Sequence, residues 1–119
     1  MIITDKKIVQ DTLDKIIDKC VFTIDKWDLQ DLFGKDPQIR MIQAAADSIN
    51  ELIPLINQDF ESIGGLPHKI LVVHAICKDM TISEFKQLYK ITVSARHVQS
   101  SIIFEKSSHG RIMAYYFFQ

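Results

Sequence analysis

Apolar residues recur near the start of the chain at the spacing of one face of an amphipathic helix. These positions are Val9, Leu13, Ile16, Ile17 and Cys20. Lysine and aspartate residues fill the intervening positions, and Thr4 or Asp5 suits the helix N-cap. The pattern predicts a surface helix with one buried side.

A second helical stripe follows Asp36 and Pro37, which suit an N-cap and a first helical turn. Its apolar positions are Ile39, Ile42, Ala45, Ala46, Ile49, Leu52, Ile53 and Ile56. Pro54 predicts a kink or a break near residues 52–53, because an interior proline removes a helical hydrogen bond. The preceding segment 22–34 fits either a short strand with a turn or a ragged helix.

The second half of the chain gives less uniform signals. Residues 70–77 are almost wholly apolar, so periodicity does not separate a buried helix from a buried strand, and we favour a helix over 68–78. Thr81 and Glu84 form a capping box that predicts a short helix. Residues 92–99 fit a further short helix, which we favour, whereas an alternating strand over 90–98 is the alternative.

The end of the chain predicts a β-hairpin. Residues 102–106 and 111–118 are rich in β-branched and aromatic side chains, and two serines, a histidine and a glycine separate them. Together these patterns predict a mostly helical α+β fold in a single domain, with an N-terminal helical part over 1–64 and a second part over 65–119 that ends in the hairpin.

Composition limits the class of protein. The chain has 119 residues, of which 47% are hydrophobic and 24% charged, with a net charge of −1, which fits one compact globular domain and excludes a disordered one. No apolar run approaches the ~20 residues that a membrane-spanning helix needs, and no secretory signal is apparent. Two cysteines, Cys20 and Cys77, are too few for a disulfide-stapled domain, so we expect free thiols and a cytoplasmic protein.

Charge is divided unevenly along the chain. Residues 1–79 hold 13 acidic against 9 basic side chains, whereas residues 80–119 hold 5 basic against 2 acidic ones. The balances are −4 and +3. A basic segment on an acidic body can steer the protein toward an anionic partner such as nucleic acid.

Motifs for catalysis and cofactor binding are absent from the sequence. It contains no nucleophile elbow, no phosphate-binding glycine loop and no dinucleotide fingerprint. His74 and Cys77 have helical i, i+3 spacing, but no adjacent residues complete a zinc site, and Glu84 is explained by its helix cap. We therefore predict that the protein is not an enzyme and needs no metal or cofactor.

Residues 68–119 resemble a winged helix-turn-helix domain. The matching segments are 68–78, 81–89 and 92–99 as three helices, the last as recognition helix, and 103–118 as the wing. The resemblance implies a transcription regulator that binds duplex DNA, as a possible dimer through the N-terminal helices. The DNA-binding residues expected on this basis are Lys90, Ser94, Arg96, His97, Gln99, Lys106, His109 and Arg111.

An alternative hypothesis is an immunity protein or antitoxin that inhibits a basic nuclease toxin by protein–protein binding. Its support is the acidic balance of residues 1–79, which would speed association with a cationic partner. The partner-binding residues expected in this case are Asp25, Trp27, Asp28 and Asp31. A subunit that acts only within a complex is a third possibility.

Overall fold

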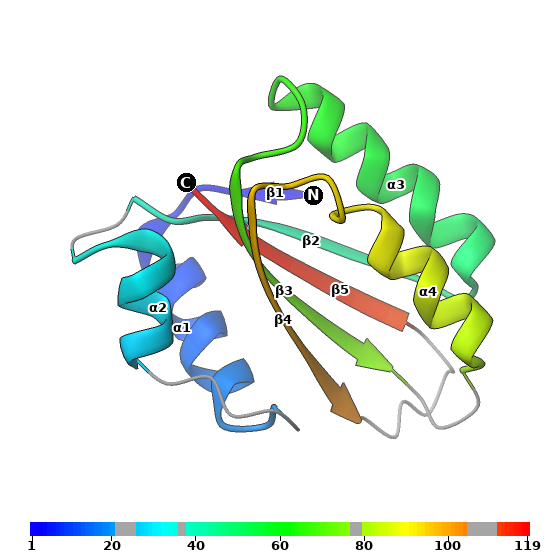
Figure 1. Cartoon of the computed structure of the whole chain (residues 1–119), viewed down its shortest axis with the longest axis horizontal. Helices are drawn as coiled ribbons and strands as arrows, with labels where there is room; N and C mark the ends of the chain where they lie inside the picture. Colours follow the sequence, from blue (N-terminus) through cyan, green and yellow to red (C-terminus); the bar gives the residue numbers. More distant parts are fainter. Residues whose placement is uncertain (21–25, 36–37, 77–79, 105–111) are drawn as a thin grey trace.

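The protein folds as a mixed five-stranded β-sheet with a pair of helices on each face (Figure 1). The computed structural model describes residues 1–20, 26–35, 38–76, 80–104 and 112–119. Its elements are β1 (Ile2–Ile3), α1 (Lys6–Ile17), α2 (Lys26–Phe33), β2 (Arg40–Ala46), α3 (Ile49–Ser62), β3 (Lys69–Ile76), α4 (Ile82–Lys90), β4 (His97–Phe104) and β5 (Ile112–Phe118).

The order of strands in the sheet is β1-β2-β5-β3-β4. The last strand of the chain, β5, therefore lies in the centre and is antiparallel to both β2 and β3. The strands β3 and β4 are parallel, with Lys69 opposite His97 and Ile76 opposite Phe104, and α4 connects them. The short β1 and the longer β4 form the two edges.

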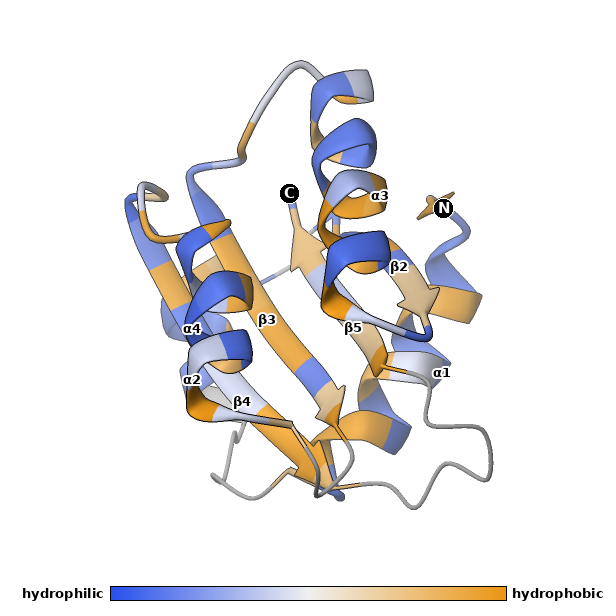
Figure 2. Ribbon diagram, turned by 90° about the vertical axis from the view of Figure 1, so that its right-hand side faces the viewer, coloured by the Kyte–Doolittle hydropathy of each residue, from blue (hydrophilic) through white to orange (hydrophobic). Residues whose placement is uncertain are grey.

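The sheet is covered on both faces, and this explains why its central strands are so apolar. Ile70, Val72, Tyr116 and Phe118 pack in the core under α3 and α4. Residues of the opposite parity, including Leu71, Val73 and Phe117, pack against α1 and α2. In Figure 2, β3 is hydrophobic along most of its length, as expected for a strand with no solvent-facing side.

Two local signals in the sequence are confirmed. Helix α1 begins after Asp5, whose carboxylate accepts hydrogen bonds from the backbone N–H groups of Lys7 and Ile8 at 3.0 and 3.1 Å, and Val9, Leu13 and Ile16 form its buried stripe. The capping box before α4 also forms. The Thr81 hydroxyl accepts a hydrogen bond from the Glu84 N–H, and the Glu84 carboxylate accepts one from the Thr81 N–H.

The prediction of a mostly helical fold is wrong, because two predicted helices contain strands. The apolar positions of residues 39–46 belong to β2, and α3 starts only after Ser48, whose hydroxyl caps it by accepting from the Glu51 N–H. Of the kink or break expected near residues 52–53, the break does not occur, because α3 continues through Pro54. Residues 69–76 form the buried strand β3 rather than a helix, since burial on both faces removes any alternation.

The predicted helix-turn-helix-like unit with a terminal β-hairpin is wrong for residues 65–119. Residues 91–96 form turns, and the segment predicted as recognition helix continues into β4. The predicted terminal hairpin does not form, because β3 lies between β4 and β5 in the sheet. Tyr116, Phe117 and Phe118 are all fully buried, because the central strand β5 has helices on both sides. Within the described ranges, no helix is long and apolar enough to cross a membrane.

Candidate functional site

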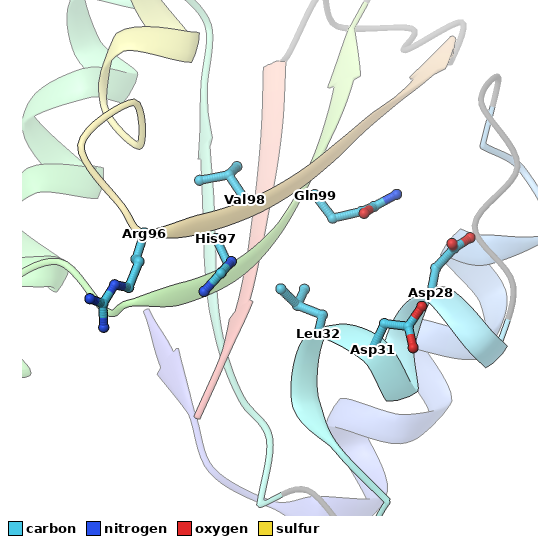
Figure 3. A pocket seen from close by; sticks show the side chains of 7 residues that line it. All are labelled: Asp28, Asp31, Leu32, Arg96, His97, Val98 and Gln99. Atoms are coloured by element: carbon cyan, nitrogen blue, oxygen red, sulfur yellow. The ribbon is translucent and has the colours of Figure 1, made fainter.

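A groove of about 370 Å³ lies between α2 and the first half of β4 (Figure 3). It is lined by Asp28, Asp31, Leu32, Arg96, His97, Val98 and Gln99. The groove is open to solvent and contains charged groups of both signs.

The two walls of the groove follow from the local sequence. In α2, Asp28 and Asp31 have i, i+3 spacing and lie on one side of the helix, while the buried Leu32 anchors α2 against the sheet. In β4, residues of alternating parity point to opposite faces. Val98 packs in the core under α3 and α4, so His97 and Gln99 face α2.

The charges are separated along the groove. In Figure 3, Asp28 and Asp31 project from α2 at the end where the Gln99 side chain extends, whereas Arg96 points away from them at the opposite end. A ligand lying along β4 would therefore meet an acidic end and a basic end.

The groove brings together residues from both rival hypotheses. Arg96, His97 and Gln99 come from the predicted DNA-binding set, and Asp28 and Asp31 come from the predicted partner-binding set.

The other predicted residues lie elsewhere. Lys90 is exposed at the end of α4 and Ser94 is exposed in the following turn, and neither lines the groove. Lys106, His109, Arg111 and Asp25 lie outside the described residues, and Trp27 is described only as a position in α2.

Sequence reasoning missed the edge of the sheet beside this groove. The His97 N–H donates to the His68 carbonyl oxygen at 2.8 Å, so the backbone groups of the odd-numbered residues of β4 point toward β3. The N–H and C=O groups of Val98, Ser100, Ile102 and Phe104 consequently point away from the sheet. None of the strands that the structure describes pairs with this outer side of β4. The alternative of an alternating strand over 90–98 was the signal that could have indicated it.

Exposed apolar side chains occur at the end of β4 and on α4. Phe104, the last residue of β4, is 57% exposed. On α4, Ile82 and Tyr89 are 76% and 46% exposed, and their i, i+7 spacing places them on one side of that helix. The exposed Phe104 therefore adds an apolar group to the outer edge of β4.

The interior holds a second polar feature, which is sealed from solvent. His74 on β3 and Tyr116 on β5 are both buried and are joined by a hydrogen bond of 3.1 Å between Nε2 and the phenolic oxygen. Burial lowers the pKa of His74 to about 4 and raises the pKa of Tyr116. Both side chains are therefore neutral near pH 7, and their enclosure leaves a substrate no access.

The described side chains include no group of three or more His, Cys, Asp or Glu residues that could hold a metal ion. That the protein is not an enzyme and needs no metal or cofactor stays a prediction. The arrangement of the groove is suited to binding through backbone hydrogen bonds, apolar contact and charge.

Comparison with known proteins shows a likeness of fold alone. No protein-family model matches the chain, and no curated protein matches it. A solved structure described as an FtsZ dimer, empty, from M. jannaschii aligns with a TM-score of 0.60 over 93% of this chain, at 13% sequence identity. The match covers 37% of that FtsZ chain, so the present chain spans well under half of its length. The likeness agrees with the mixed sheet and not with a mostly helical fold.

Proposed function

We propose that this chain is a non-catalytic protein-binding module whose interface is the outer edge of β4 together with the groove beside α2. The observation that carries the proposal is the length and composition of β4. It has eight residues, and none of them is Asp, Glu, Lys, Arg or Pro.

Natural sheets protect their edges, because unpaired backbone groups invite pairing with other chains. Short strands, lysine side chains and prolines are common protective devices. The opposite edge of this sheet follows the rule, since β1 has only two residues. The edge at β4 has none of these devices, and this contrast supports a partner that covers it.

An inhibitor of a basic protein belongs to this class of function. Asp28 and Asp31, predicted as partner-binding residues, lie beside the proposed interface. The carboxylates of Asp28 and Asp31, which line the same groove, also disfavour a phosphate backbone there. DNA binding stays a prediction, and it has lost the recognition helix on which it was based.

A comparison of edge variants tests the proposal. Phe104→Lys places a charge on the outer edge, whereas Leu55→Lys places the same charge at an exposed apolar position on α3, remote from β4. Wild-type and variant proteins serve as baits in extracts of the source cell, with quantitative mass spectrometry of the captured proteins. We expect at least one protein that the wild type and Leu55→Lys capture and Phe104→Lys does not.

Two results would contradict the proposal. One is a set of captured proteins that is the same for all three baits. The other is a combination of two observations. Duplex DNA binds in fluorescence anisotropy and binds more weakly to Arg96→Ala, while the captured proteins do not depend on Phe104.

A further inference from the structure

We propose that the partner binds as an extended segment that adds a further strand to β4, with apolar side chains on the face of α4 and a basic side chain opposite Gln99, toward Asp28 and Asp31. This inference rests on the proposed function and specifies the chemistry of the partner at that interface. It follows from three properties of the edge: the direction of its backbone groups, the different chemistry of its two faces, and the position of the charges.

The backbone of β4 supplies the docking points. The outward N–H and C=O groups belong to Val98, Ser100, Ile102 and Phe104, because the intervening residues bond to β3. An extended peptide laid against this edge would exchange hydrogen bonds with those four residues, as in other cases of β-strand addition. Backbone pairing of this kind supplies affinity with little dependence on sequence.

The two faces of the edge require different side chains from the peptide. On the face shared with α4, β4 presents the partly buried Ile102 and the exposed Phe104. Peptide side chains on this face would be apolar, since they replace water around Phe104. Because successive residues of a strand alternate between faces, the intervening peptide side chains point toward α2.

Charge determines which peptide side chains fit on the α2 face. On the α2 face, a peptide residue opposite Gln99 lies at the end of the groove that Asp28 and Asp31 line. A lysine or arginine at that position would approach two carboxylates. Each exposed ion pair adds little affinity, so these charges select the partner more than they hold it.

A second copy of the chain is the competing occupant of the edge. Its β4 has no Lys or Arg, so the nearest basic side chain that a second copy brings to this edge is Arg96, which lies just before the strand. A segment with its own lysine or arginine on the α2 face complements both faces, whereas the β4 strand of a second copy has no basic residue of its own. Self-association is therefore an outcome that the experiment must detect.

Fluorescence anisotropy with synthetic peptides tests the inference. The probe is a fluorescein-labelled peptide with lysine and valine in alternation over the length of β4. One control peptide has glutamate in place of lysine, a second has the same composition in two blocks, and a third has N-methyl groups on alternate backbone nitrogens. We expect binding of the first peptide and at least roughly tenfold weaker binding of each control, since each loses charge, alternation or strand pairing.

Protein variants locate the peptide. Asp28→Asn with Asp31→Asn should weaken binding roughly fivefold, which corresponds to the loss of two exposed ion pairs. The matched control, Asp11→Asn with Asp14→Asn, has the same i, i+3 spacing on α1 and should leave binding unchanged. Phe104→Lys should abolish binding, whereas Leu55→Lys should not.

Several outcomes would overturn the inference. One is that the glutamate, block or N-methylated peptide binds as tightly as the lysine–valine peptide. Another is that the two aspartate double variants lose the same affinity. A third is that the lysine–valine peptide does not bind. A dimer in light scattering that Phe104→Lys dissociates and Leu55→Lys preserves would assign the edge to a second copy. If a cellular protein is still captured in a Phe104-dependent manner, the proposed function stands and only the peptide pattern fails.

Discussion

The imidazole Nε2 atom of His74 lies 3.1 Å from the phenolic oxygen of Tyr116, on neighbouring strands in the centre of the sheet. The ring of Phe60 meets the Tyr116 ring edge-on at a centroid distance of 5.3 Å, and the ring of Phe85 meets His74 at 6.0 Å. The two polar groups thus bond to each other inside an aromatic cluster. Because burial disfavours the charged imidazolium, protonation of His74 is coupled to unfolding.

Stability should fall between about pH 6.5 and pH 4 as His74 becomes protonated in the unfolded chain. Its pKa is 6.5 in the unfolded state and about 4 in the folded state, so the unfolded chain binds more protons in this interval. The stabilisation is complete above pH 6.5 and is lost as the pH falls toward 4. The loss approaches roughly 3 kcal/mol at the lower limit.

Urea unfolding at several pH values measures this effect. His74→Gln is the comparison, because its amide can still bond to Tyr116 but does not titrate in this range. The free energy of unfolding of this variant should depend less on pH than that of the wild type. Equal slopes for the two proteins would show that His74 is not the titrating group.

Tyr116→Phe should destabilise the protein by about 1–3 kcal/mol, because it leaves the buried His74 without its hydrogen-bond partner while keeping the aromatic packing. Tyr89→Phe removes the same hydroxyl from a residue that is 46% exposed on α4 and should change stability by less than about 0.5 kcal/mol. Thermal or urea unfolding compares the two variants. Equal effects would contradict the role of the buried hydrogen bond.

The cap of α4 gives a prediction that is independent of the core. Thr81→Ala should reduce the free energy of unfolding by about 1 kcal/mol, because the Glu84 N–H loses its acceptor at the start of the helix. Thr81→Ser should restore most of the loss. Ser83→Ala, at an exposed position in the first turn, is the control and should have little effect in the same urea titration.

Alanine substitutions of Phe117 and Phe104 should have different effects on stability and on peptide binding. Phe117 is fully buried in β5, so Phe117→Ala should cost about 3–5 kcal/mol of stability. Phe104 is 57% exposed, so Phe104→Ala should cost less than about 0.5 kcal/mol. If Phe104 belongs to the interface, this variant should nevertheless lose affinity for the lysine–valine peptide. A large loss of stability in Phe104→Ala would place the residue in the core instead.

Short-range signals in the sequence were sufficient where one element determines its own structure. The stripe of Val9, Leu13 and Ile16 and the capping box at Thr81 each involve residues within a few turns of one helix. Strands depend on distant partners. The pattern of β3 is ambiguous until β4, β5 and helices on both faces bury it, and the insertion of β3 between β4 and β5 leaves no local trace in the sequence.

The candidate site was only partly predictable for the same reason. Asp28 and Asp31 were expected from their charge, and Arg96, His97 and Gln99 from a basic segment, but in separate hypotheses. Only the packing of α2 beneath the sheet brings the two sets into one groove. That no described strand pairs with the outer side of β4 follows from the strand order, which the alternation of one strand does not contain.

Amide hydrogen exchange should test directly whether the outer side of β4 is unpaired. The N–H groups of His97, Gln99, Ser101 and Ile103 point to β3 and should exchange slowly, while those of Val98, Ser100, Ile102 and Phe104 point outward and should exchange at least roughly tenfold faster. NMR measurement on the free protein gives this alternation residue by residue. Addition of the lysine–valine peptide should slow the outward amides and leave the inward ones nearly unchanged, because strand addition forms hydrogen bonds only on the outer side. Uniform protection along β4 in the free protein would mean that the edge is already covered, and uniform rapid exchange would mean that β4 is not a stable strand.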